Sequence, residues 1–271
     1  MDISKNRGSV FVVRSVYIIR RLRYSVIVLF LSAVLTSCST APVKPIKTPA
    51  IEICPVSIQP EIRQDIHHTV APGETLWHLS KVYDVSIKEI MMANELNSRT
   101  DLKMGQRICI PDAGSLRPVI PLYRLNKWRF VIIHHSATDE GSALCFYKFH
   151  RSRGWANLGY HFVIDNGTER KQDGQIEVSP RWTKQQNGAH CQAGGMNYKG
   201  IGICLVGNFN EAKVSQKQLD SLVYLVNILR DYYDIPIKNI IGHCQVTGAK
   251  TECPGKYFPW DEFKARLKNS N

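Results

Sequence analysis

The stretch that decides the fold of this 271-residue chain is residues 130–135, which read FVIIHH. Four apolar residues in a row are typical of a strand that is buried on both faces of a sheet. Further apolar runs follow at residues 160–164, 201–206 and 237–242, and segments with helical spacing separate them. Strands that alternate with helices predict an α/β domain with a mixed, largely parallel central sheet flanked by helices.

Two of these strands end in histidine, at His134 and His243, and Cys253 follows ten residues after the second. Functional side chains of α/β sheets gather at strand ends. Two imidazoles and one thiolate form a catalytic type of zinc site, because the fourth tetrahedral position stays open for water. The spacing alone is weak evidence, since a histidine at a strand end is more often a hydrogen-bonded core or surface residue. Strand alternation turns His135 to the other face, away from such a metal.

A smaller unit at residues 67–111 precedes the large one. Residues 71–74 (APGE) form a turn signal, residues 76–83 have apolar side chains at helical spacing, and Ser86 with Glu89 forms a capping box. Residues 105–111 (GQRICIP) close the unit as a strand. The run resembles a LysM domain over its whole length. That resemblance implies a small βααβ fold that binds N-acetylglucosamine polymers such as peptidoglycan and performs no chemistry.

The large unit, residues 127–271, contains a series of short motifs. They are IHHSAT (133–138), GYHF (159–162), GAH (188–190), IGI (201–203), VGNF (206–209), GH (242–243) and TECPG (251–255). In this order they resemble the zinc-dependent N-acetylmuramoyl-L-alanine amidases, which include type 2 amidases and animal peptidoglycan recognition proteins. The resemblance implies an enzyme that cleaves the amide bond between N-acetylmuramic acid and L-alanine. It also implies that His134, His243 and Cys253 bind Zn²⁺.

The same resemblance implies further site residues. Tyr160 falls on the family's catalytic tyrosine, and Thr251 stands where other relatives have lysine or threonine. His190 is expected to bind substrate, although support of a metal ligand is an equally open role. Some relatives have a glutamate where this chain has Cys204, so a glutamate base is not expected there. The alternative is a non-catalytic peptidoglycan-binding lipoprotein with a degenerate amidase fold, but such proteins lose the cysteine ligand, which is Cys253 here.

The first 37 residues predict an export signal. They contain basic residues and an apolar run at residues 25–35 (SVIVLFLSAVL), too short for a comfortable membrane span. The ending LTSC at residues 35–38 resembles a bacterial lipobox, which implies a lipid on Cys38 and a membrane anchor. Residues 38–66 read as a proline-rich tether and residues 112–126 as a linker. We therefore expect a location in the bacterial cell envelope, at the periplasmic face of the outer membrane.

The formal net charge is +12, from 35 Lys+Arg against 23 Asp+Glu, and residues 1–37 contribute five of it. The remaining positive charge suits binding to an anionic cell wall, and the sequence has no basic-aromatic motif for nucleic acid. We expect a monomer. Besides Cys38 and Cys253, six cysteines remain, which permit up to three disulfides in an exported protein. Cys54 with Cys109 is one candidate pair, and Cys204 is a candidate for a plain buried thiol.

Overall fold

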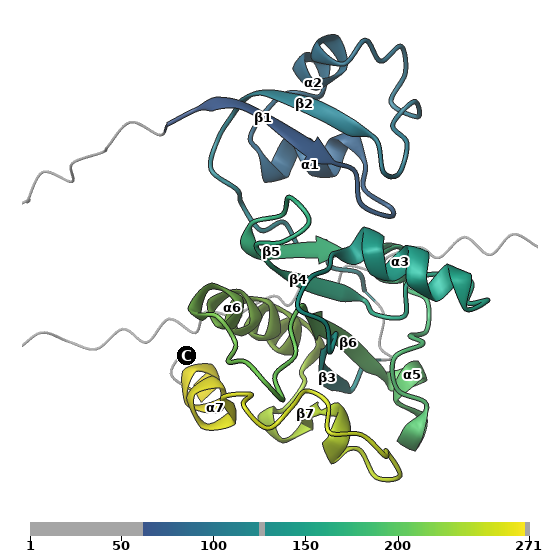
Figure 1. Ribbon diagram of the computed structural model, residues 1–271, viewed down its shortest axis with the longest axis vertical. Coiled ribbons are helices and arrows are strands. Elements are labelled where there is room, and N and C mark those ends of the chain that lie inside the picture. Colours follow the sequence, from purple (N-terminus) through teal and green to yellow (C-terminus); the bar gives the residue numbers. More distant parts are fainter. Residues whose placement is uncertain (1–61, 125–127, 269–271) are drawn as a thin grey trace, which may run out of the picture. The chain divides into compact units, whose positions relative to one another are not determined.

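The structure is a computed structural model that describes residues 62–124 and 128–268 (Figure 1). The predicted signal segment, the lipidation site Cys38 and nearly all of the tether lie outside the described residues. No helix within the described ranges combines the length and the apolar character that crossing a bilayer requires.

The small unit forms the predicted strand, helix, helix and strand. Its elements are β1 (Gln64–Thr69), α1 (Leu76–Val82), α2 (Ile87–Ala93) and β2 (Arg107–Ala113). The two strands pair antiparallel. The capping box is present, because the Ser86 hydroxyl accepts the Glu89 N–H and the Glu89 carboxylate accepts the Ser86 N–H.

The core of the small unit lies between its two helices and its sheet, where Leu76, Leu79, Ile90, Ile108 and Ile110 are at most 1% exposed. Asn94 ties the end of α2 to β2. Its amide nitrogen donates to the carbonyls of Ile90 (2.7 Å) and Cys109 (2.6 Å), and its carbonyl oxygen accepts the Cys109 N–H at 2.7 Å. The side chain thus satisfies backbone groups that the helix end leaves open.

The large unit is built on a five-stranded sheet. Its elements are β3 (Phe130–His135), α3 (Ala143–Ser152), β4 (Phe162–Asn166), β5 (Asp173–Val178), α4 (Pro180–Thr183), α5 (Met196–Lys199), β6 (Gly200–Leu205), α6 (Gln216–Tyr233), β7 (Ile240–Gly242) and α7 (Trp260–Lys268). The strand order is β5-β4-β6-β3-β7 (Figure 1). Only the β4–β5 pair is antiparallel among these neighbours, which confirms the predicted mixed, largely parallel sheet.

Strand β5 was not predicted from the sequence. It reads DGQIEV, and the side chains of Gln175 and Glu177 are 7% and 1% exposed. Because polar side chains occupy buried positions of this edge strand, its sequence lacks the apolar run or clear alternation that marks a strand.

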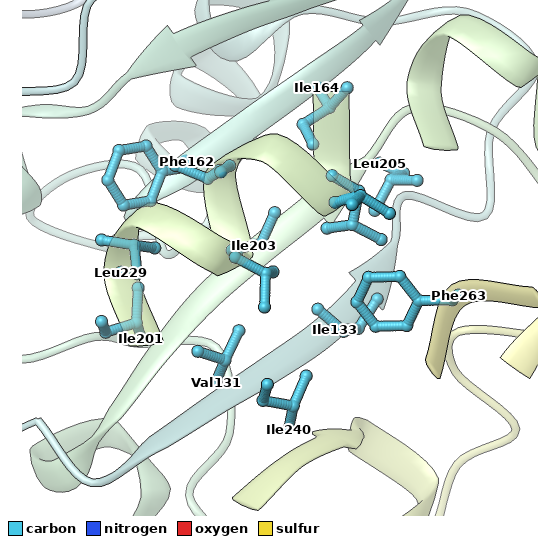
Figure 2. Packing of buried hydrophobic residues seen from close by; sticks show 14 of the residues in the cluster. Val131, Ile133, Phe162, Ile164, Ile201, Ile203, Leu205, Leu229, Ile240 and Phe263 are labelled. Carbon is cyan, nitrogen blue, oxygen red and sulfur yellow. The ribbon is translucent and has the colours of Figure 1, made fainter. Parts of the chain in front are cut away.

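The main core lies on one face of the sheet. Side chains of α6 and α7, including Leu229 and Phe263, pack there against alternate residues of the strands (Figure 2). Val131 and Ile133 of β3 belong to this core, whereas Ile132 belongs to a smaller cluster with Cys191 and Met196. Since side chains alternate along a strand, His134 lies on the face opposite α6.

Candidate metal centre

His134 and His243 are brought together by two neighbouring parallel strands. In the register of β3 and β7, Ile133 pairs with Gly242, so the two histidines occupy equivalent positions one residue further on. Their ring centroids are 4.7 Å apart. The carboxyl ends of parallel strands meet at one edge of the sheet, which is where functional sites of α/β folds form.

Cys253 reaches the same edge from the loop after β7. The loop is held back against the strand ends because the Cys244 N–H donates to the Cys253 carbonyl at 2.7 Å. Gly242 permits this close approach: a Cβ at that position would lie 2.8 Å from Cδ of Pro254 and 2.8 Å from the Trp260 ring. The glycine before His243 is therefore needed for the loop that brings in the third ligand.

The three side chains fit a zinc ion. Their ligand atoms all lie within 4.8 Å of one another, and Nδ1 of His134 is 3.6 Å from Sγ of Cys253. Ordinary Zn–N and Zn–S bond lengths at a tetrahedral angle place such atoms about 3.5 Å apart. His134 and Cys253 are buried, whereas His243 is partly exposed, so the cluster borders solvent on one side. The structure therefore confirms that the three predicted zinc ligands come together in one cluster.

The electrostatics of the cluster favour a metal over a proton on the imidazoles. Burial lowers the pKa of His134 well below its usual range, and the neighbouring His190 and His243 lower it further. Burial also lowers the pKa of His243. Neutral rings keep a lone pair for a cation. Burial raises the pKa of the Cys253 thiol to about 12, so a thiolate there requires a nearby cation.

The backbone of His135 supports the same sulfur. Its N–H donates to Sγ of Cys253 at 3.3 Å, a contact that opposes the effect of burial on the thiol. The His135 ring lies elsewhere, because its Nδ1 accepts the Phe209 N–H at 3.1 Å. His135 is therefore not one of the three clustered side chains, as alternation predicts.

Tyr160 and Thr251 lie beside the cluster in different settings. The Tyr160 ring centroid is 5.3 Å from that of His134. Burial, together with Cys204 and Cys253, raises the pKa of Tyr160 well above 10, so the phenol keeps its proton and can donate it in a hydrogen bond. Thr251 is exposed, and its hydroxyl accepts the Cys253 N–H at 3.1 Å. Their catalytic roles stay predictions.

Cys204 pairs with His134 in the register of β3 and β6 and is completely buried. Burial raises the pKa of its thiol well above the usual range, with Cys253 adding to the shift. The chain thus has a neutral, completely buried thiol at this position, in agreement with the expected plain buried thiol.

The sequence permitted up to three disulfides, and none joins two of the cysteines that the structure describes. Those that carry free thiols are Cys109, Cys145, Cys191, Cys204, Cys244 and Cys253. The candidate pair of Cys54 with Cys109 includes a residue outside the described ranges. Cys191 and Cys204 pack as small apolar side chains in two different clusters.

His190 lies behind His134 and away from solvent. Its Nδ1 is 3.0 Å from Nε2 of His134, and its own Nε2 is 3.2 Å from the carbonyl oxygen of Gly200. Burial lowers its pKa to about 3. The GAH motif at residues 188–190 singles out His190, but its distance in sequence from the other motifs does not indicate a contact with His134. The predicted contact with substrate stays a prediction.

Comparison with known proteins agrees with this site. The pattern of the N-acetylmuramoyl-L-alanine amidase family matches residues 124–256, and the LysM domain pattern matches residues 68–111. Peptidoglycan-recognition protein SC2 of Drosophila melanogaster is 31% identical over 149 residues, which cover 51% of this chain and 74% of the fly protein. The chain belongs to the N-acetylmuramoyl-L-alanine amidase family.

Other proteins similar to this amidase-family chain come from phages and bacteria. The endolysin of Escherichia phage T7 is 30% identical over 111 residues, or 38% of this chain and 67% of the endolysin. The solved structure of N-acetylmuramoyl-L-alanine amidase LysC from Clostridium intestinale URNW is 32% identical, with 55% of this chain and 91% of that chain covered and a TM-score of 0.45. The sequence matches confirm the amidase and LysM resemblances and the predicted enzyme class.

Proposed function

We propose that the protein is a lipid-anchored, zinc-dependent peptidoglycan hydrolase. It cleaves the amide bond between the lactyl group of N-acetylmuramic acid and L-alanine of the stem peptide. The observation that carries this proposal is the grouping of His134, His243 and Cys253 within 4.8 Å, in a chain of the amidase family.

The donor set defines the chemistry. Zinc held by these three residues would polarise the scissile carbonyl and lower the pKa of water to about 7, which makes a nucleophile available at neutral pH. Attack of the water oxygen on the lactyl carbonyl carbon breaks the C–N bond. The saccharide keeps a carboxylate, and the peptide leaves with a free L-alanine amino group that takes up the protons of the water.

Two side chains act on the reacting groups. The Tyr160 hydroxyl, held in its protonated form, donates to the oxygen on which negative charge develops. The Thr251 hydroxyl accepts the Cys253 N–H and is exposed, so its own proton is available to substrate or water. Both roles depend on a hydroxyl group, which hydrophobic packing of the side chain alone would not require.

The other segments place the catalytic unit at its substrate. The LysM domain, residues 67–111, binds the glycan strands, and the tether of residues 38–66 links it to a lipid on Cys38. This arrangement places the enzyme at the periplasmic face of the outer membrane. A binding domain on the same chain raises the local concentration of wall substrate at the active site.

Mass spectrometry of purified sacculi after digestion tests the reaction. We expect free stem peptides with a new L-alanine amino terminus and glycan strands whose muramic acids have lost their peptides. Cleavage within the glycan or within the peptide would contradict the proposal. Binding to sacculi without any product would instead favour the non-catalytic alternative.

Labelling with a radioactive fatty acid in a bacterial host tests the anchor. The wild-type chain should incorporate the label and fractionate with outer membranes, and the C38S variant should do neither. Equal labelling of both chains would contradict lipidation at Cys38 without affecting the proposed reaction.

A further inference from the structure

We propose that His190 is a positioning residue that fixes which ring nitrogen His134 presents to zinc. This role rests on the proposed function, because it takes the cluster of His134, His243 and Cys253 as the metal centre. Of the two roles that the sequence left open for His190, substrate contact and support of a metal ligand, this is the second. A histidine ligand needs its other ring nitrogen held by a partner, which sets both the tautomer and the ring orientation.

The contacts of the two rings determine where the protons lie. Nδ1 of His134 faces Sγ of Cys253 at 3.6 Å, so Nε2 points away from the cluster, toward Nδ1 of His190 at 3.0 Å. At the far end, Nε2 of His190 lies 3.2 Å from the Gly200 carbonyl, which can only accept a hydrogen bond.

One assignment satisfies all these contacts when both rings are neutral. His190 donates its Nε2–H to the Gly200 carbonyl and accepts the Nε2–H of His134 at its Nδ1. His134 then has no proton on Nδ1, and that lone pair faces His243 and Cys253. A backbone carbonyl thus sets the tautomer of the ligand through an intervening imidazole.

The His190 ring is held in a narrow slot. A Cβ added at Gly188 or at Gly202 would overlap the ring, so both glycines let the backbone approach it directly. The His190 N–H donates to the side-chain oxygen of Asn197 at 2.8 Å. The final acceptor, Gly200, lies on β6 and pairs with Phe130 of β3, the strand that ends in His134. The pairing of β3 with β6 therefore fixes the distance between His134 and the Gly200 carbonyl, which are the two ends of this series of contacts.

His161 provides a matched control. It is completely buried, and its ring centroid lies 5.5 Å from that of His190. Its Nδ1 accepts the Gly202 N–H at 2.9 Å, and its Nε2 lies 3.1 Å from the Gln186 carbonyl. Both histidines bridge backbone groups in the same region, but His190 also contacts a residue of the metal cluster.

The test measures zinc affinity by competition with a chromophoric chelator, on full-length variants. H190L removes the acceptor and should weaken zinc binding about 10- to 100-fold. H190N places an amide oxygen near the position of Nδ1 and should recover most of that loss. H161L should lower the melting temperature but leave the zinc Kd unchanged. A wild-type Kd in H190L, or an equal loss in H161L, would overturn the role of His190.

Nitrogen-15 NMR of the wild-type protein provides a second test that does not depend on a variant folding. We expect a protonated Nε2 on His134 both without metal and with zinc, and zinc on Nδ1. A protonated Nδ1 in the metal-free protein, or zinc on Nε2, would overturn the inference. Failure of the wild-type chain to bind zinc would sink the proposed function itself, whereas zinc binding that H190L leaves unchanged sinks only the role of His190.

Discussion

The LysM domain and the catalytic unit each bury a histidine, but they surround it with different partners. In the LysM domain, Nδ1 of His68 is 2.9 Å from the Tyr83 hydroxyl and Nε2 is 2.7 Å from the Glu74 carboxylate. In the catalytic unit, His134 meets His190 on one side and Cys253 on the other. Both nitrogens of His68 thus contact oxygen atoms, whereas His134 directs its Nδ1 at the sulfur of a second potential metal ligand.

The difference shows that the partners of a buried histidine decide its role. The Glu74 carboxylate and the Tyr83 hydroxyl engage the two ring nitrogens of His68, so these side chains are satisfied without a metal. The cluster around His134 instead brings two imidazoles and a thiol within 4.8 Å of one another, which is the donor set of a zinc site. Four predictions test this contrast: three concern the metal cluster and its neighbours, and one concerns the carboxylate partner of His68.

The largest effect is expected from loss of the thiol ligand. C253S should reduce amide hydrolysis by about 10³-fold or more, because the metal contributes several kcal/mol of transition-state stabilisation. The matched control is C244S, since Cys244 is exposed and lies outside the cluster. Initial rates on a soluble muropeptide measure both variants, and near wild-type activity in C253S would contradict the metal assignment.

The second effect concerns the carboxylate partner of His68. Burial alone would raise the pKa of Glu74, but the charge and hydrogen bond of His68, with the Ala71 N–H, bring it down to about 2 from an ordinary value of 4.5. A lowered pKa means that the carboxylate stabilises the fold above about pH 4.5, and that this stability is lost as the pH falls toward 2.

E74Q should therefore destabilise the LysM domain by on the order of 3 kcal/mol at neutral pH, and the gap to wild type should close near pH 2. Thermal melts across this pH range measure it, and E95Q, at an exposed carboxylate of the same domain, is the control. A gap between E74Q and wild type that is independent of pH would argue against the lowered pKa of Glu74.

The third prediction concerns the tyrosine beside the cluster. Y160F should lower kcat about 10²-fold, the usual cost of one lost donor to a developing oxyanion, while zinc content stays unchanged. Y147F is the control, because Tyr147 packs in the same small cluster as Tyr160. If Y160F lost zinc together with activity, Tyr160 would be a support of the metal site instead of a donor to substrate.

The smallest effect is expected at Thr251. T251V keeps the side-chain shape but loses the hydroxyl that accepts the Cys253 N–H, so kcat/KM should fall by about tenfold, the equivalent of one ordinary hydrogen bond. T251S should restore most of the rate. Kinetics of both variants at saturating zinc would check this, and a wild-type rate in T251V would remove Thr251 from the mechanism.

Much of the fold could be predicted from the sequence, because the apolar runs at 130–133 and 201–206 are local signals. The metal cluster could be predicted only through the order of the family motifs, since strand-end histidines alone are weak evidence. Strand β5 could not, since its buried Gln175 and Glu177 carry no apolar pattern. The contact of His190 with His134 depends on space left by Gly188 and Gly202, which sequence spacing does not indicate. The sequence left the pairing of the cysteines open, because an even number in an exported protein permits disulfides without specifying the geometry that a pair needs.

The most direct test of the central contrast is the zinc content of full-length variants after dialysis against trace zinc, measured by atomic emission. Wild type and H68Q should each retain one zinc per chain, and H134A should retain none. Zinc kept by H134A, or lost from H68Q, would contradict the conclusion that the partners of His134 make it a metal ligand and those of His68 do not.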